Sequence, residues 1–186
     1  MSRSAPDEGL IRATLQGDQQ AFAGLVNRYL RKAMAVALEY LGTREDAEDA
    51  VQDTFRRVLD ALPRFDPKRP FGPWFFTILR NTARNAAKGR RLRTHDELGT
   101  EHQSGLPDPL ELTGREELGR RIAEAIARLP AMQQTCVRLC LVEGLSNAEA
   151  AGATGLAEST VRVHVFRARQ TLQALLAEWR GGLEES

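Results

Sequence analysis

The sequence near the C-terminus, LSNAEAAGATGLAESTVRVHVFRARQTLQALL, constrains the fold more than any other stretch. Ser146 and Glu149 have the spacing of a capping box, small residues follow, and Gly155 stands where a short helix would end. A second helical pattern begins near Ser159. A short helix, a glycine-containing turn and a longer amphipathic helix are the parts of a helix-turn-helix, whose second helix enters the major groove of DNA.

The second of these helices divides into a buried stripe and an outward face. Apolar residues recur at spacings of three and four and predict the buried stripe: Val161, Val165, Ala168, Leu172, Leu175, Leu176 and Trp179. On the outward side, Arg162 and Arg167 can reach phosphates or a guanine edge, and Val163 and Phe166 can meet thymine methyl groups. The alternative is a solvated helix whose arginines only keep it soluble.

The remaining patterns are helical throughout, and no strand signal occurs. Before residue 94 we expect helices at 7–16, 19–41, 44–62 and 71–90, and after residue 112 helices to Arg128 and from Pro130 to Glu143. Apolar spacing in the 19–41 segment predicts that these residues face inward: Phe22, Leu25, Val26, Tyr29, Leu30 and Ala33. The expected fold class is therefore all-α.

A polar segment rich in Gly, Pro and Asp separates the two groups of helices. We predict a first domain at 1–93, a flexible linker at 94–112 and a second domain at 113–186 that contains the helix-turn-helix. The chain has 186 residues and 42% apolar content, which suits two small domains with real cores. No signal peptide or membrane span is evident, so we expect a cytoplasmic protein without membrane insertion.

Charge is arranged in blocks, although the net charge is only +1. Acidic residues are concentrated in the segment from Arg44 to Asp53, and the helix dipole, which favours acidic residues at a helix start, explains part of them.

Cys136 and Cys140 lie one helical turn apart, and the three histidines are scattered. Core thiols are the favoured interpretation, and we expect no metal and no cofactor.

The segment RFDPKRPFGPWFFTILRNTARNAAKGRRLR joins a proline-rich loop to an aromatic and then a basic helix. Arg80, Arg84 and Lys88 follow one another at helical spacing, and Asn81 and Asn85 lie one turn apart beside them. Cations can hold the phosphates of a single strand while amides bind an extruded base. The alternative is that the aromatic residues are core and the asparagines are surface filler.

Five blocks of this sequence, in order and spacing, resemble the extracytoplasmic-function (ECF) sigma factors of bacterial RNA polymerase. They are AFAGLVNRYL, REDAEDAVQDTFRRVLDAL, FGPWFFTILRNTARNAAKGRR, LPAMQQTCVRLCLVEGLSNAEAA and STVRVHVFRARQTL. The resemblance implies an initiation factor that binds the beta and beta-prime subunits of core RNA polymerase and promoter DNA. It also implies control by an anti-sigma factor.

The resemblance assigns roles to three sets of residues. The minus-thirty-five element would be read by Arg162, Val163, Phe166 and Arg167. The melted minus-ten element would be bound by Asn81 and Asn85, with the loop around Phe65 and the basic residues Arg80, Arg84 and Lys88. The polymerase clamp would contact Asp49, Gln52 and Asp53.

Two other functional classes account for less of the sequence. A helix-turn-helix regulator acting without stable polymerase binding would leave the acidic helix and the Asn81/Asn85 track unused. An enzyme is not expected, because no nucleophile, base and orienting group come together and no phosphate loop is present.

Overall fold

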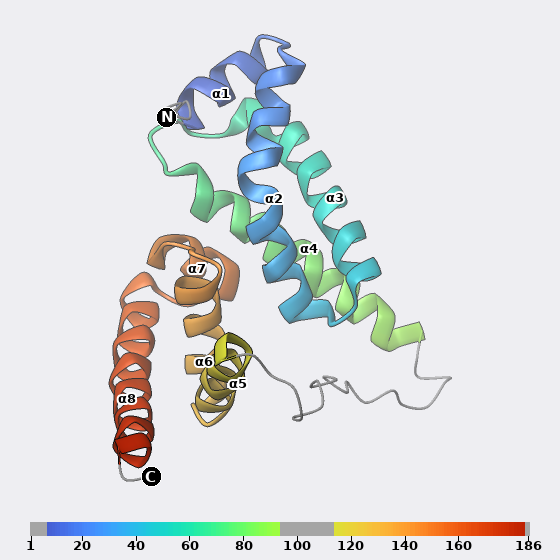
Figure 1. Cartoon of the computed structure of the whole chain (residues 1–186). Coiled ribbons are helices and arrows are strands. Elements are labelled where there is room, and N and C mark those ends of the chain that lie inside the picture. Colours follow the sequence, from blue (N-terminus) through green and yellow to red (C-terminus); the bar gives the residue numbers. More distant parts are fainter. Residues whose placement is uncertain (1–6, 94–113, 185–186) are drawn as a thin grey trace.

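The protein is represented by a computed structural model that describes residues 7–93 and 114–184, with side chains from 7–90, 119–175 and Ala177. Within these ranges the chain forms helices and no strand, as the sequence predicts (Figure 1). The helices are α1 (Asp7–Leu15), α2 (Gln19–Leu41), α3 (Arg44–Ala61), α4 (Phe71–Arg93), α5 (Gly114–Ala127), α6 (Ala131–Val137), α7 (Asn147–Thr154) and α8 (Glu158–Glu184). The predicted linker lies outside the described residues.

Helices α1 to α4 enclose an aromatic core. The ring of Tyr29 lies 5.0 Å from that of Phe75 and 5.3 Å from that of Phe71, and the ring of Phe55 lies 5.1 Å from that of Phe75. The Tyr29 hydroxyl donates a hydrogen bond of 2.6 Å to Asp7, which ties α1 to α2. These contacts fix α4 along one side of the bundle.

The inward face predicted for α2 is correct except at one residue. Leu25, Tyr29 and Ala33 are buried, and Phe22 and Val26 are half-buried. Leu30 is 41% exposed, so its predicted inward position is wrong. It stands next to Tyr29 in sequence, and a step of about 100° turns it away from the core.

The second group of helices carries the helix-turn-helix. The Ser146 hydroxyl accepts from the Glu149 amide and the Glu149 carboxylate accepts from the Ser146 amide, which completes the predicted capping box. Gly155 ends α7 with φ of 82°, a backbone conformation that favours glycine. Helix α6 does not run straight to Glu143 as predicted, because its last turn, Arg138–Val142, widens into a π-helix named η4.

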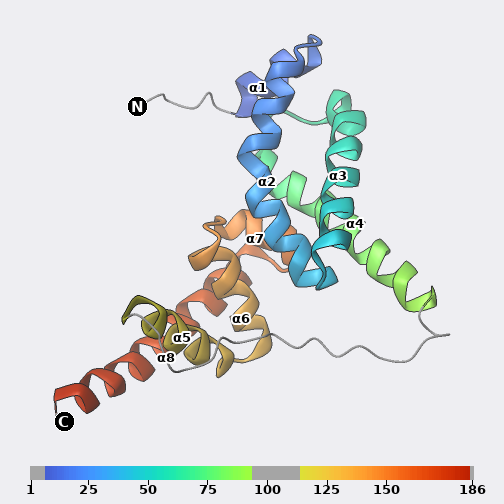
Figure 2. The same ribbon diagram turned by 45° about the vertical axis from the view of Figure 1, so that its right-hand side comes forward.

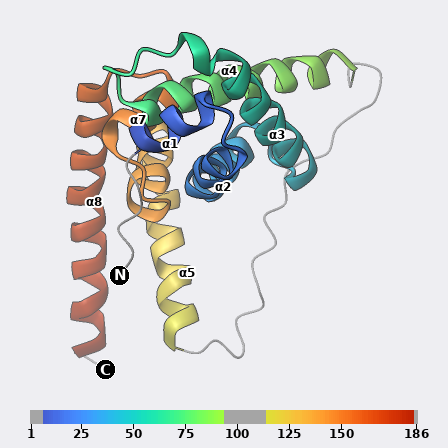
Figure 3. The ribbon, with the colours of Figure 1, turned by 90° about the horizontal axis from the view of Figure 1, so that it is seen from above.

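The two groups of helices pack against each other, which the sequence did not predict. Helix α7 lies on α4 and beside α2, and one apolar cluster runs from Phe75 through Ala150 and Ala153 to Val161 (Figure 2). The approach is close at Gly152, where a Cβ atom would lie 2.4 Å from the carbonyl oxygen of Pro73. Viewed from above, α5 and α8 extend away from the first bundle (Figure 3).

Candidate nucleic-acid interface

The outward face of α8 is free of the core. Val161, Val165 and Ala168 are buried, whereas Phe166 is 61% exposed and Val163 is 45% exposed. The N-terminal half of α8 therefore presents two bare apolar side chains to solvent. Such exposure is unusual for a phenylalanine and is typical of a contact surface.

Basic side chains surround these apolar residues. Arg162, Arg167 and Arg169 are all exposed, and Arg162 makes an ion pair of 3.1 Å with Glu158 one turn earlier. Because both partners of that pair are largely solvent-exposed, the pair stabilises the helix only weakly and leaves the guanidinium available. His164 is half-buried, and its Nδ1 has no hydrogen-bond partner among the described residues.

A second group of predicted residues comes together on α4. Asn81, Arg84, Asn85 and Lys88 line a hollow of about 730 Å³, together with Ala87 and Tyr40. The two asparagines and the two cations are exposed. Their separation of three or four residues along one helix puts the amides and the positive charges on the same side, as the sequence predicts. Tyr40 comes from α2 and was not predicted.

Arg80 differs from the rest of this track. It is half-buried, and its Nε and Nη2 lie 3.4 and 3.3 Å from the Oδ1 of Asn81. A Cβ atom at Gly155 would meet its guanidinium at 2.3 Å. The arginine therefore packs against the turn of the helix-turn-helix.

Phe65 lies apart from Asn81 and Asn85. Its ring packs 4.6 Å from that of Trp74 and 5.7 Å from that of Phe71, at the opposite end of α4. It borders a separate, largely apolar cavity of about 580 Å³. Ser146, Ala148 and Glu149 at the start of α7 also line that cavity. The structure therefore does not join Phe65 and the asparagines in one site.

The acidic surface of α3 is only partly available. Asp49 and Gln52 are exposed, whereas Asp53 bonds Arg57 at 2.6 Å and Arg56 at 2.5 Å. The hydrogen bonds from Arg57 and Arg56 hold the pKa of Asp53 below its ordinary range. Asp53 thus carries a charge that is already offset by arginines three and four residues later on its own helix.

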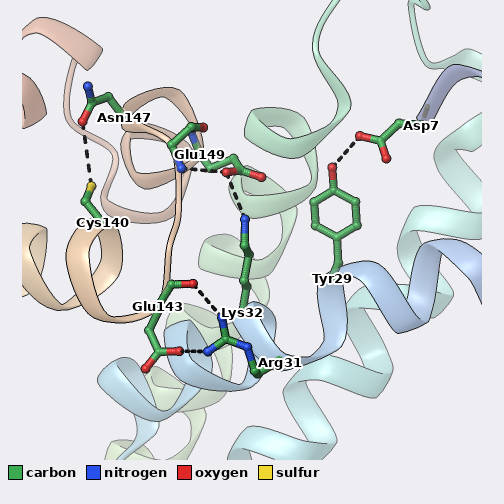
Figure 4. Close-up of polar contacts among 9 residues, drawn as sticks. Asp7, Tyr29, Arg31, Lys32, Cys140, Glu143, Asn147 and Glu149 are labelled. Carbon is green, nitrogen blue, oxygen red and sulfur yellow. Dashed lines mark hydrogen bonds and ion pairs between the residues drawn. The ribbon is translucent and has the colours of Figure 1, made fainter. Parts of the chain in front are cut away.

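Among the described residues, four pairs of residues make polar contacts between the two groups of helices (Figure 4 draws the first two pairs). Arg31 bonds the carboxylate of Glu143 at 2.7 Å, and Lys32 lies 3.5 Å from the carboxylate of Glu149. The other two contacts are the 2.9 Å ion pair of Arg138 with Glu39 and the 2.7 Å hydrogen bond from the Tyr40 hydroxyl to the Ala153 carbonyl.

The cysteines behave as core thiols. Cys136 is fully buried and Cys140 is half-buried, and burial raises the pKa of Cys136 to about 11. No group of side chains suited to a metal ion occurs in the described part of the chain. Among the described helices, none is both long and apolar enough to cross a membrane.

The fold is that of a two-part helical protein whose second part contains a helix-turn-helix, a motif that binds DNA. Residues 25–93 match the family model for Sigma-70 region 2, and residues 119–172 match that for Sigma-70, region 4. The RNA polymerase sigma factor NccH of Alcaligenes xylosoxydans xylosoxydans is 38% identical over 95% of this chain and 97% of its own length. The ECF RNA polymerase sigma-E factor of Haemophilus influenzae is 31% identical over 93% of this chain and 96% of its own.

Two solved structures are similar to this chain in fold and in sequence. The complex of CnrH with the cytosolic domain of CnrY gives a TM-score of 0.59 at 31% identity, covering 92% of this chain and 97% of that one. The sigma factor RpoE bound to the anti-sigma factor NepR, from Bartonella quintana, gives 0.55 at 28% identity, covering 84% and 96%. The chain belongs to the ECF sigma factors, and it acts with core RNA polymerase in promoter recognition and transcription initiation.

Proposed function

We propose that this sigma factor divides promoter recognition between the outward face of α8 and the hollow on α4. The observation that carries the proposal is the gathering of Asn81, Arg84, Asn85 and Lys88 around one hollow, on a different helix from the exposed face of α8. Two separate surfaces suit two separate DNA elements, one read as a duplex and one as a single strand.

The α8 face is assigned to the duplex minus-thirty-five element. Arg162 and Arg167 supply cations for phosphates or a guanine edge, and Val163 and Phe166 supply apolar contacts for thymine methyl groups. Their exposure in the free chain supports the assignment, because a recognition helix needs no rearrangement to enter the groove.

The α4 hollow is assigned to the melted minus-ten element. Arg84 and Lys88 would hold the backbone of the separated strand, with Arg80 joining them, while Asn81 and Asn85 bind the edge of an extruded base. Phe65 would act elsewhere on the same strand, because it borders another cavity about 10 to 20 Å away along α4, given about 1.5 Å of rise per residue.

Core polymerase would dock on α3. Asp49 and Gln52 would make most of the contact because they are exposed. Asp53 would contribute less to binding, because Arg56 and Arg57 already offset its charge. The contact would be electrostatic, with a basic element of the polymerase clamp facing the acidic helix.

An anti-sigma factor is the proposed regulator, and the cytoplasm is the proposed location. The support for a regulator is that two similar structures are complexes, one of them with a protein named an anti-sigma factor. Every role assigned here is one of binding, and none requires turnover.

Run-off transcription on a genomic promoter library, with purified core polymerase, tests the proposed function. We expect a restricted set of transcripts that depends on the added chain. A regulator that binds DNA without polymerase would shift promoter fragments in a binding assay but would produce no factor-dependent transcript, and that result would reject the proposal.

A further inference from the structure

Tyr40 of α2 lies at the contact between the two groups of helices and interacts with both. Its side chain borders the α4 hollow next to Asn81 and Asn85. Its hydroxyl donates a 2.7 Å hydrogen bond to the carbonyl of Ala153 in α7. Burial raises the pKa of Tyr40, while the charges of Arg80 and Arg84 act in the opposite direction, so this ring lies among the cations of the track.

The packed arrangement cannot hold both promoter elements at once. Gly155, three residues before α8, touches Arg80 on α4, so the two DNA-facing surfaces begin next to each other. Counting helical rise from that contact, Phe166 and Asn85 lie within about 30 Å of each other. Elements some 25 base pairs apart are separated by about 85 Å at 3.4 Å per base pair. DNA this short is stiff, since its persistence length is about 150 base pairs.

Recognition of both elements therefore requires α7 to leave α4 and α2. When α7 leaves, the hydrogen bond from the Tyr40 hydroxyl to the Ala153 carbonyl is broken. If η4 leaves together with α7, two further hollows that Tyr40 borders each lose one wall, because Leu139 of η4 lines both of them. The ring of Tyr40 then becomes accessible beside the asparagines, while the rest of the α4 hollow is unchanged.

We propose that Tyr40 has two successive roles: it ties α7 to the first domain in the closed chain, and its ring stacks on an unpaired base of the melted strand once the chain opens. The proposal rests on the assignment of the α4 hollow to the minus-ten element. An aromatic ring suits the position because cations already border it and every base has a face that can stack. The asparagines would then hydrogen-bond the edge of a base, and the ring of Tyr40 would stack on the face of a base.

The DNA role is tested with the complex of this chain and core polymerase. The probe is a fluorescein-labelled oligonucleotide selected from a randomised single-stranded pool on the wild-type complex. Tyr40→Leu keeps an apolar side chain but lacks an aromatic face, and we expect its affinity to fall roughly five- to hundredfold. Tyr40→Phe keeps the ring and should retain most of the affinity. Equal losses in both variants, or no loss in Tyr40→Leu, would overturn the stacking role.

The role of Tyr40 in holding α7 on the first domain is tested on the free chain by small-angle X-ray scattering. Tyr40→Phe removes the bond to Ala153 and should shift the equilibrium toward open chains by roughly fivefold, which increases the radius of gyration. Tyr29→Phe is the matched control, since it removes a hydroxyl bond to Asp7 within the first domain. A radius that rises equally in both variants, or in neither, would overturn the tie.

A double variant separates this inference from the proposed function. If Asn81→Ala with Asn85→Ala lowers oligonucleotide affinity and Tyr40→Leu does not, the α4 assignment stands and the role of Tyr40 falls. If neither affects it, the assignment of the α4 hollow itself is wrong and the inference falls with it.

Discussion

Helices α8 and α4 carry the two surfaces proposed to contact DNA, and they differ in how complete those surfaces are in the free chain. Phe166 on α8 is 61% exposed and belongs to none of the apolar clusters found among the described residues. On α4, by contrast, Arg80 packs against Gly155, and neighbouring Tyr40 is bonded to Ala153. The surface proposed to read the duplex is therefore already exposed in the closed chain, whereas part of the surface proposed to bind the single strand is shared with the contact between the domains.

The largest effect expected from this difference comes from Asn81→Ala combined with Asn85→Ala. Flipping a base costs a few kcal/mol, which hydrogen bonds to its edge must offset, so we expect open-complex formation on duplex promoters to fall about a hundredfold. Permanganate footprinting measures the opening. Gln19→Ala with Gln20→Ala removes two exposed amides from α2 and should open promoters normally. Normal opening by the asparagine variant would make these residues surface filler.

Substitutions on α8 should change selectivity, with a smaller effect on any one promoter. A good base contact contributes on the order of 1 to 3 kcal/mol, so Phe166→Ala and Arg167→Ala should relax the preference at particular upstream positions. Arg169→Ala, on the flank, should weaken all promoters alike. Binding selections on randomised minus-thirty-five duplexes measure these profiles. Indistinguishable profiles for the three variants would contradict this division of the helix.

Charge reversal on α3 should weaken binding of core polymerase, and the two aspartates should not be equivalent. Asp49→Lys removes an exposed negative charge and adds repulsion, so we expect about tenfold weaker binding. Asp53→Lys should cost less, because Arg56 and Arg57 already offset that carboxylate. Fluorescence titration of core polymerase gives both affinities, and circular dichroism checks that helicity is kept. A greater loss from Asp53→Lys would reverse the assignment.

The smallest effect concerns Cys136, in the core between the domains. Burial raises its pKa from the ordinary 9.0 to about 11, so the unfolded chain loses this proton first as the pH rises. The contribution to stability is full below pH 9 and is lost between about 9 and 11. Urea unfolding across this range should show a downward slope that Cys136→Ala reduces. An unchanged slope in that variant would show that other groups cause it.

Local patterns predicted much of this molecule. The capping box at Ser146 and the helix stop at Gly155 follow from chemistry within a few residues, and they appear as expected. The grouping of Asn81 with Arg84 and Lys88 also follows from spacing along one helix. Each of these features depends on a single element, which is why sequence alone could specify it.

Features that join separate elements could not be predicted in this way. Nothing near Tyr40 in sequence points to Ala153, and nothing near Gly152 points to Pro73, because only the packing of α7 on α2 and α4 brings them together. The pairing of Asp53 with Arg56 and Arg57 was not predicted either, although these arginines lie one turn away on the same helix. A check of i+3 and i+4 neighbours would have found that pairing.

The most direct test of the account compares transcription from a duplex promoter with transcription from the same promoter premelted across the minus-ten element. If α4 acts at strand opening and α8 at duplex recognition, the premelted template should restore much of the activity of the Asn81→Ala, Asn85→Ala variant. It should restore little to the Phe166→Ala, Arg167→Ala variant. Equal rescue of both variants, or rescue of the α8 variant alone, would contradict the assignment of the two surfaces to two steps.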